Sequence, residues 1–271
     1  MTVRVAVTGA AGKMGSMVVD AAQERGDAIG LASLLERPDH PSLGKAIAPG
    51  LSIGADAAAA LACADVCIDF STPATTAQLV EIAAAKRVAM VIGTTGLDVA
   101  CRESIERAAA SIPVVLAPNF SLGIGLLLRL VEQMARVLGP DFDVEVVELH
   151  HRLKRDAPSG TALALGDAIL KGRGDANQGC LRLAREGETG ARTAQEVGVM
   201  ALRGGDVVGE HTVFFLGPGE RLEITHRAGS RAIFARGAVR AALWICGKPP
   251  GLYGIADVLG LTGTPADRNT G

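Results

Sequence analysis

Short apolar runs alternate with longer amphipathic segments along residues 1–121 of the chain. The segments between the runs have helical spacing over roughly ten to fifteen residues, and one opens with the helix-capping sequence Ser71-Thr72-Pro73. Apolar runs that end in glycine or other turn residues are typical of strands buried on both faces of a sheet. The alternation predicts repeated βαβ units, with parallel strands near Val3–Thr8, Ala28–Leu35, Val66–Phe70, Val88–Ile92 and Pro113–Ala117.

The pattern changes after residue 121, where strands no longer alternate with helices. A helix predicted over Leu122–Leu138 leads to a strand that ends in two adjacent histidines, His150 and His151, and another helix begins at Ser159. Three strand-like stretches then follow without helices between them, near Val197–Arg203, His211–Leu216 and Arg221–His226. This layout predicts a second domain of the α+β class with a mixed, open sheet.

A final alanine-rich, apolar helix is expected over about Ser230–Cys246. We expect it to pack on the parallel sheet, so that the first domain is discontinuous. The predicted fold is a Rossmann-like α/β domain formed by residues 1–121 and 231–271, plus the α+β domain formed by residues 122–230. The tail Thr262–Gly271 is expected to lack fixed structure.

Three glycines directly follow the first predicted strand and open a helix. Gly9, Gly12 and Gly15 form a GxxGxxG variant of the dinucleotide-binding fingerprint. Glycines at these positions allow the backbone to close on a pyrophosphate, whose negative charge the helix N-terminus favours. A tight turn without a ligand is the alternative. The order of strand, glycines, helix and a second strand ending in an acid favours a nicotinamide dinucleotide.

The acid at the end of the second strand is Glu36, about twenty residues beyond the glycines. Its carboxylate is placed to bind the ribose hydroxyls of NADH, whereas the adjacent Arg37 could pair with the 2′-phosphate of NADPH. The presence of both Glu36 and Arg37 predicts that the protein accepts NADH as well as NADPH. The alternative is that the two residues form only a solvated ion pair on the surface. Two further strand ends could face the nicotinamide or form ordinary turns, Gly93-Thr94-Thr95 and Ala117-Pro118-Asn119-Phe120.

The segment EVVELHHRLKRDAPSGTA, residues 145–162, carries the chemistry expected of the second domain. A histidine can exchange a proton near neutral pH, and Lys154 follows the two histidines in a loop. Adjacent residues of a strand point to opposite faces, so His150 and His151 address one ligand only if the strand bends there. Ser159-Gly160-Thr161 is typical of a helix N-cap, whose N–H groups can hold a carboxylate. The segment is therefore predicted to hold and protonate a small anionic substrate.

Composition argues against several other functions. The net charge of −2 and the aromatic content of 3% do not indicate a nucleic-acid partner. The five cysteines have no metal-ligand spacing, and His150-His151 has no third ligand nearby, so no metal is predicted. Among the other histidines, His211 and His226 are interpreted as structural or interface residues, and His40 lies in a loop. Without an apolar run of about 18 residues or a signal-peptide pattern, we expect a cytoplasmic protein that does not enter a membrane.

Several motifs along the chain together resemble one enzyme family. They are GAAGKMG, VIGTTG, APNFSLG, ELHHRLKRDAPSGTA, REG, RGGDVVGEHTVFF and ERLEITHRAGSR, and the similarity runs from Val3 to about Leu261. This set is similar to bacterial dihydrodipicolinate reductase, also called 4-hydroxy-tetrahydrodipicolinate reductase. The pattern His-His-x-x-Lys-x-Asp-x-Pro-Ser-Gly-Thr is highly specific to that family, whereas the glycine triplet is not. No matched catalytic position departs from the family pattern.

The resemblance implies reduction of the dipicolinate precursor by NADH or NADPH, in diaminopimelate and lysine synthesis. It implies that His150 is the general acid/base and Lys154 the second proton donor. It also implies that His151 and Ser159-Gly160-Thr161 hold the carboxylates of a small dicarboxylate substrate, and that a homotetramer assembles through residues 122–230. The residues implied to contact the dinucleotide are Gly9, Ala10, Ala11, Gly12, Lys13, Met14, Glu36, Arg37, Gly93, Thr94, Thr95, Ala117, Pro118, Asn119 and Phe120.

Two other interpretations stay open at the level of sequence. Another two-domain NAD(P)-dependent oxidoreductase, such as an amino-acid or sugar dehydrogenase, would explain residues 1–121 but not the combination of His150, Lys154 and the Ser-Gly-Thr turn. A non-catalytic NAD(P) sensor would not need a proton donor facing its cofactor. Loss of the reduced-nicotinamide absorbance only when the dipicolinate precursor is present would separate the reductase from both.

Overall fold

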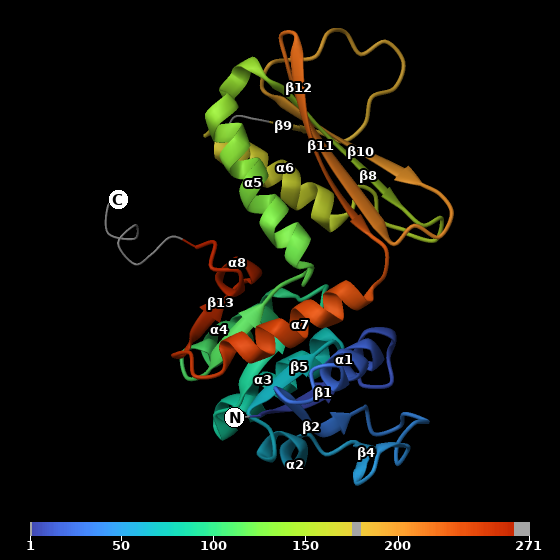
Figure 1. The fold of residues 1–271 in the computed structure, drawn as a ribbon, viewed down its shortest axis with the longest axis vertical. Coiled ribbons are helices and arrows are strands. Elements are labelled where there is room, and N and C mark those ends of the chain that lie inside the picture. Colours follow the sequence, from blue (N-terminus) through green and yellow to red (C-terminus); the bar gives the residue numbers. More distant parts are fainter. Residues whose placement is uncertain (1, 175–179, 263–271) are drawn as a thin grey trace. The chain divides into compact units, whose positions relative to one another are not determined.

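The computed structural model describes residues 2–174 and 180–262 (Figure 1). It divides into two compact units, Met1–Leu122 with Arg231–Gly271, and Gly123–Ser230. Most of the tail expected to lack fixed structure, residues 263–271, lies outside the described residues. Each unit has a sheet and a hydrophobic core of its own.

An eight-stranded sheet forms the centre of the first unit. Its five central strands coincide with the predicted apolar runs, and each pairs in parallel with its neighbours in this group. They are β1 (Val3–Thr8), β2 (Ile29–Leu35), β5 (Val66–Asp69), β6 (Ala89–Ile92) and β7 (Pro113–Leu116), in the spatial order β7-β6-β5-β1-β2. Because parallel strands point the same way, the loops that follow these strands meet at one edge of the sheet.

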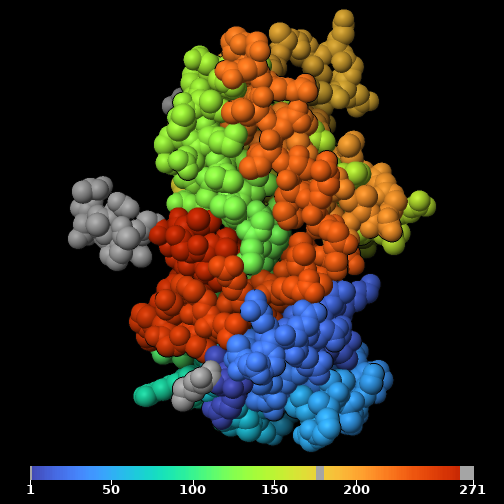
Figure 2. Space-filling model, in the orientation of Figure 1, coloured from blue at the N-terminus to red at the C-terminus, as the bar shows by residue number. Residues whose placement is uncertain are grey.

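Helices cover both faces of this sheet, as the βαβ pattern predicts. One face carries α1 (Lys13–Gln23), α7 (Ala232–Ile245) and α8 (Ile255–Val258). The other face carries α2 (Ala57–Ala62), α3 (Pro73–Lys86) and α4 (Val99–Ala109). Figure 2 shows the red residues of the C-terminal segment against the blue N-terminal residues of the same unit. The last long helix thus completes a core begun by the first strand, because its buried alanines and valine pack against α1 and the sheet.

The connection between β2 and β5 differs from the helical pattern predicted for it. It contains an antiparallel hairpin, β3 (Ala46–Ala48) and β4 (Leu51–Gly54), and its helix α2 is only six residues long. Strand β4 extends the sheet beside β2, and β13 (Gly251–Tyr253) extends the opposite edge beside β7. These strands have three or four residues, too few to show a period, so pairing with a neighbour and not local pattern makes them strands.

The second unit is built on a five-stranded mixed sheet, as predicted. Its elements are α5 (Leu122–Leu138), the short 3-10 helix Gly139–Asp141, β8 (Asp143–His150), α6 (Gly160–Arg173), β9 (Cys180–Arg182), β10 (Glu196–Arg203), β11 (Gly209–Gly217) and β12 (Glu220–Ala228). Strand β8 pairs in parallel with β10 and antiparallel with β11, and both helices pack on one face of the sheet (Figure 1). None of the described helices is both long and apolar enough to cross a membrane.

Candidate active site

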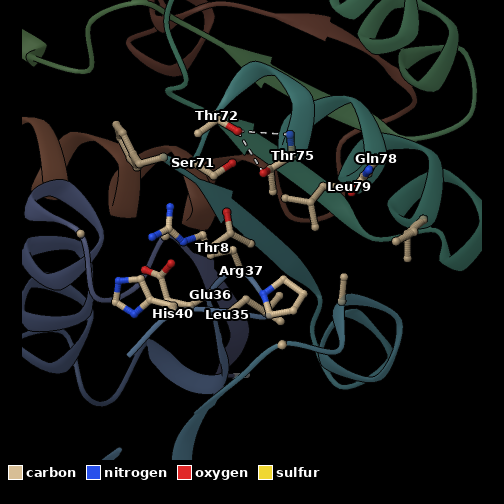
Figure 3. Close-up of a pocket in the computed structure, with 17 residues that line it drawn as sticks. Thr8, Leu35, Glu36, Arg37, His40, Ser71, Thr72, Thr75, Gln78 and Leu79 are labelled. Carbon is tan, nitrogen blue, oxygen red and sulfur yellow. Dashed lines mark hydrogen bonds between the residues drawn. The ribbon is translucent and has the colours of Figure 1, made fainter. Parts of the chain in front are cut away.

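A cavity of about 600 Å³ lies at the carboxyl edge of the first unit's sheet (Figure 3). Four residues predicted to contact a dinucleotide line it, and they are Gly9, Gly12, Glu36 and Arg37. Figure 3 shows Glu36 and Arg37 across the hollow from residues of the β5–α3 loop and of α3. The volume is within the range of cofactor sites, which occur at this edge of parallel sheets.

The glycine loop between β1 and α1 is shaped for close approach. Gly9 has a positive φ of 66°, and a Cβ added there would lie 2.9 Å from the carbonyl oxygen of Phe70. A Cβ on Gly15 would lie 2.0 Å from the carbonyl oxygen of Gly9, so only glycine allows α1 to start against the loop. The N-cap of α1 is Gly12, which supplies no capping side chain. The first N–H groups of α1 therefore suit an external anion, and the loop fits the pyrophosphate of a dinucleotide.

Glu36 holds the glycine loop as well as lining the cavity. Its Oε1 accepts a hydrogen bond from the backbone N–H of Ala11 at 2.9 Å, which ties the end of β2 to the loop. The Arg37 guanidinium lies 3.1 Å from Asp39 on the exposed surface. An exposed pair of this kind contributes little stability, so Arg37 can exchange this partner for a phosphate at small cost.

The other two predicted strand-end loops follow β6 and β7 at the same edge, but they are not among the described residues that line the cavity. Ala117 and Phe120 are buried, at 2% and 1% exposure. The Phe120 ring packs edge to face on Phe70, with 5.9 Å between ring centroids. Any contact of these two residues with a cofactor therefore goes through their backbone and not through their side chains.

A fully buried carboxylate, Asp69 at the end of β5, organises this edge of the sheet. It accepts hydrogen bonds from the hydroxyls of Thr8, Ser71 and Thr76, each at 2.5 Å, and of Thr94 at 3.2 Å. These hydroxyls come from β1, the β5–α3 loop, α3 and the loop after β6. Since a buried carboxylate requires such donors, the network joins the end of β1, the start of α3 and the loops after β5 and β6, including the predicted cofactor residue Thr94.

In the second unit, Glu148 and His150 lie two residues apart on the inner face of β8. His150 Nδ1 is 2.5 Å from Glu148 Oε2. The same fully buried carboxylate accepts the backbone N–H of Ser159 at 3.0 Å and two N–H groups of Arg203, each at 2.9 Å. One carboxylate therefore holds the histidine, the start of α6 and an arginine of β10.

The charges of this cluster follow from its contacts. Burial lowers the pKa of His150, as do the nearby charges of Lys154 and Arg203, and the hydrogen bond to Glu148 only partly offsets them. Burial raises the pKa of Glu148, but the hydrogen bonds from Arg203, His150 and Ser159 outweigh it and hold that pKa below its ordinary value. At neutral pH, Glu148 is thus ionised and His150 is largely neutral.

The loop between β8 and α6 joins the same cluster. Lys154 Nζ pairs with Asp156 Oδ2 at 2.9 Å, and Arg203 donates to the Asp156 carbonyl oxygen at 2.6 Å. Ser159 is the N-cap of α6, since its Oγ accepts the N–H of Ala162 at 3.2 Å. The residues predicted to hold and protonate substrate lie on one strand end, its loop and the following helix start: His150, His151, Lys154, Ser159, Gly160 and Thr161.

Comparison with known proteins matches both units to one family. The family model for "Dihydrodipicolinate reductase, N-terminus" matches residues 3–120, and the model for "Dihydrodipicolinate reductase, C-terminus" matches residues 123–259. The chain belongs to the dihydrodipicolinate reductase family. This assignment confirms the resemblance seen in the motifs and the predicted class, an NAD(P)H-dependent oxidoreductase.

Individual relatives of the family cover the chain almost end to end. The 4-hydroxy-tetrahydrodipicolinate reductase of Anaeromyxobacter sp. (strain Fw109-5) is 51% identical over 264 residues, which are 96% of this chain and 98% of the relative. That of Alkalilimnicola ehrlichii is 47% identical and covers 96% of this chain and 100% of the relative. The dipicolinate-bound dihydrodipicolinate reductase from Paenisporosarcina sp. TG-14 has a TM-score of 0.78 at 25% identity, covering 95% of this chain and 99% of that one.

Three residues of the cluster formed by β8, its loop and the start of α6 were not identified from the sequence, namely Glu148, Arg203 and His211. His211 was interpreted as a structural or interface residue, yet its Nε2 lies 3.3 Å from Ser159 Oγ and its ring meets His150 edge to face at 5.2 Å. The alternation along β8 could have revealed Glu148, because a carboxylate at an inward position needs buried partners. Arg203 and His211 carry no such local signal, since Arg203 lies 55 residues from Glu148 and His211 lies 52 residues from Ser159.

At the cofactor end, the sequence placed His40 only in a loop and did not assign the hydroxyl residues to the cavity that they line. His40 lines the cavity, and its Nδ1 accepts the backbone N–H of Ser42 at 3.1 Å. Thr8 and Ser71 also line it and stand at or near the ends of β1 and β5. Their places at strand ends were a usable signal, because ligands of parallel sheets bind there. For His40 the only signal was its closeness in sequence to Arg37.

Acid is expected to destabilise the protein through His211. Burial, with the charge of nearby His150, lowers the pKa of His211 to about 4. That is below the unfolded value of about 6.5, so protonation favours the unfolded chain and stability is lost as the pH falls from about 6.5 toward 4. Between pH 7.5 and 5 the loss from this one group is on the order of 2 kcal/mol of unfolding free energy.

Urea unfolding at these two pH values, compared between wild type and His211→Gln, measures this contribution. The variant should lose less stability on acidification, because its side chain does not titrate. The remaining loss includes His150 and His226, whose pKa values burial also lowers. The same pH dependence in wild type and variant would show that His211 is not held neutral by the fold.

Proposed function

We propose that this chain reduces 4-hydroxy-tetrahydrodipicolinate to tetrahydrodipicolinate with NADH or NADPH, as a step of diaminopimelate and lysine synthesis. The net change replaces a ring hydroxyl by hydrogen, so it takes up one hydride and one proton and releases one water. Bound NAD(P)H would supply the hydride. The protein must then bind a small dianion, place it, and deliver a proton near neutral pH.

The cluster of β8, its loop and α6 is the observation that carries this proposal. A dicarboxylate substrate needs donors for its carboxylates, and the N-terminus of α6 supplies N–H groups and a favourable dipole at Gly160 and Thr161. We assign His151 and Ser159 to the same binding role. His150 exchanges the proton, since it stands at the end of β8 with Nδ1 on a buried carboxylate. Lys154, in the connecting loop, is the second proton donor.

The cofactor part of the proposal rests on the glycine loop and the residues around it. We assign the pyrophosphate to residues 9–14 and the adenosine ribose to Glu36, with the loops at residues 93–95 and 117–120 toward the nicotinamide. The cavity and the close approach of Gly15 to Gly9 support the first two assignments. The position of the other two loops at the same sheet edge supports the third.

Turnover in the presence of defined substrates tests the reductase proposal. Purified protein is mixed with NADPH or NADH, and the absorbance of the reduced nicotinamide is followed with and without freshly generated 4-hydroxy-tetrahydrodipicolinate. We expect the absorbance to fall only when this substrate is present. Binding of NADPH without any loss of absorbance would identify a sensor. Turnover only with amino-acid or sugar substrates would identify another oxidoreductase.

Replacing Arg37 with alanine is expected to weaken NADPH binding by at least about tenfold and to leave NADH binding nearly unchanged. One charge-assisted contact to the 2′-phosphate is worth about 1.5–3 kcal/mol, and NADH has no such phosphate. Fluorescence titration of both cofactors at one fixed salt concentration measures the ratio. Arg102→Ala, which removes the same charge from the exposed surface of α4, is the matched control. An equal loss for both cofactors would place Arg37 away from the phosphate.

We also propose that the enzyme is a homotetramer that assembles through residues 122–230, and that it acts in the cytoplasm. The outer face of the second sheet supports assembly, because alternation along its strands leaves apolar side chains there: Val147, Leu149, Met200, Leu202, Phe214 and Leu216. Leu202 is 53% exposed in the single chain. The five free cysteines support a reducing compartment.

Sedimentation equilibrium tests the assembly. The wild type should have four times the mass of one chain, and Leu202→Asp should lower that mass because it places a charge in the buried interface. A wild type that sediments as a single chain would refute the tetramer.

A further inference from the structure

We propose that Glu148 is a positioning residue that fixes the tautomer and orientation of His150, and that Arg203 keeps this carboxylate ionised for the purpose. The inference rests on the proposed function, in which His150 exchanges a proton with substrate. It goes beyond that function by assigning the proton to one ring nitrogen and by naming the groups that hold it there.

The geometry makes Nδ1 of His150 the inner nitrogen. This nitrogen lies 2.5 Å from Oε2 of Glu148, whose side chain is fully buried. An ionised carboxylate can only accept hydrogen bonds, so the proton of a neutral His150 must sit on Nδ1. The other nitrogen, Nε2, then carries the lone pair and is the one that can exchange a proton with a ligand.

The surroundings of Nε2 agree with this assignment. The residue beside it is Gly209, at the start of β11, and a Cβ added there would lie only 2.9 Å from Nε2. A side chain at this position would therefore cover the nitrogen or displace the ring. The ring of His211 packs edge to face against His150 and limits its rotation from the same strand. The imidazole is thus held by Glu148 at Nδ1, and Gly209 places no side chain over Nε2.

Arg203 stabilises the ionised form of the buried Glu148 carboxylate. Burying an ionised carboxylate is costly unless hydrogen-bonded partners replace its water, and a protonated Glu148 could donate to Nδ1 and favour the other tautomer. Both oxygens of Glu148 receive an N–H of Arg203 at 2.9 Å, and Oε1 also receives the N–H of Ser159. These three N–H donors keep the Glu148 side chain ionised, so that it accepts the hydrogen bond from Nδ1 of His150.

The same carboxylate links the proton donor to the substrate-binding turn. Because Glu148 holds both His150 and the N–H of the α6 N-cap Ser159, the ring and the helix start keep one relative position. Arg203 extends this frame to the loop of Lys154, since it donates to the carbonyl oxygen of Asp156. The position of a substrate carboxylate bound at α6 is therefore fixed relative to His150, which exchanges the proton.

The first test needs only the wild-type protein. Long-range proton–nitrogen correlation spectra of protein labelled with ¹⁵N-histidine report which ring nitrogen carries hydrogen, and loss of signals in His150→Gln identifies His150 among the five histidines. At a pH where His150 is neutral, we expect hydrogen on Nδ1 and a bare Nε2. Hydrogen predominantly on Nε2 would overturn the proposal, whether or not any variant folds.

The second test replaces Glu148 with glutamine and compares it with Glu145→Gln. Glu145 lies on the same strand but pairs with Arg185 and Arg192, so its variant also neutralises a carboxylate of β8 and should leave turnover unchanged. Glu148→Gln should lower kcat by at least roughly 10²-fold, since loss of the correct tautomer in the carboxylate–histidine pair of serine proteases, which are unrelated enzymes, costs about 10⁴-fold. The affinity for NADPH should not change.

The pH profile separates positioning from a general loss of structure. The charged and titratable groups facing His150 are Glu148 on β8, Arg203 on β10, Lys154 in the loop and His211 on β11. Of these, only Glu148 raises the pKa of His150, so without its charge the His150 limb of kcat/KM should move to lower pH. A variant that was merely misfolded would lose activity without moving this limb.

Failure of the inference and failure of the function can be told apart. If wild-type protein does not reduce 4-hydroxy-tetrahydrodipicolinate, the proposed function is wrong, while the spectra still report the tautomer. If wild type turns over and Glu148→Gln matches its kcat and pH profile, the reductase stands and the positioning role of Glu148 is refuted.

Discussion

Replacing His150 with glutamine is expected to lower kcat by roughly 10²- to 10⁴-fold, the usual range for loss of a general acid or base. Glutamine has a similar reach but cannot exchange a proton near neutral pH, so the loss should fall mainly on kcat and little on KM. The affinity for NADPH should stay near the wild-type value, because the residues that line the dinucleotide cavity belong to the first unit. Steady-state kinetics with a separate cofactor titration measure all three quantities.

Two further variants make the His150 result specific. His226→Gln changes another partly buried histidine of the same unit and should retain near-normal turnover. Thr161→Ala should mainly raise KM, since the α6 turn binds a charge that is present in both the ground state and the transition state. Near-normal kcat in His150→Gln would reduce this residue to a structural role.

Replacing Lys154 with alanine is the second large effect, again a loss of roughly 10²- to 10⁴-fold in kcat. The Lys154 side chain lies in the loop after β8 and is only 21% exposed, and its ammonium group pairs with Asp156 at 2.9 Å. Its hydrogen bond to Asp156 holds the pKa of that carboxyl below its ordinary value. Since the same charge can attract a substrate carboxylate, KM should rise as well, unlike in His150→Gln.

Arg155→Ala is the matched control for Lys154, because it removes a neighbouring cation that is exposed in the same loop. This control should change kcat by less than a few fold. Equal losses in both variants would mean that the total charge of the loop matters and that Lys154 has no particular role in proton delivery.

At the edge of the first sheet that carries the predicted cofactor residues, the local sequence pattern predicted the backbone but not the side-chain contacts. The order of strand, glycines, helix and acid predicted the loop that the structure shows, because each part is a local requirement of the backbone near a phosphate. Local pattern did not predict that Glu36 also binds the N–H of Ala11, nor that Asp69 of β5 binds Thr8 of β1 and Thr94 after β6. Both contacts join strands that are adjacent in the sheet but distant in sequence.

The edges of the first sheet were missed for a different reason. The hairpin of β3 and β4 and the strand β13 are too short to show a period of their own. Their backbone becomes extended because a neighbouring strand offers hydrogen-bond partners, and this pairing is a property of the folded sheet.

By itself, the sequence determined the parallel sheet with helices on both faces, the mixed second sheet, the glycine loop, and the strand, loop and helix start that carry His150, Lys154 and Ser159. These features depend on period, turn residues and caps, which act over a few residues. Only the tertiary structure decided which groups surround His150, because Arg203 and His211 come from strands that pair with β8 across more than fifty residues. Which ring nitrogen of a histidine can exchange a proton depends on the charges and hydrogen-bond partners packed around the ring. Strand pairing and burial determine those neighbours.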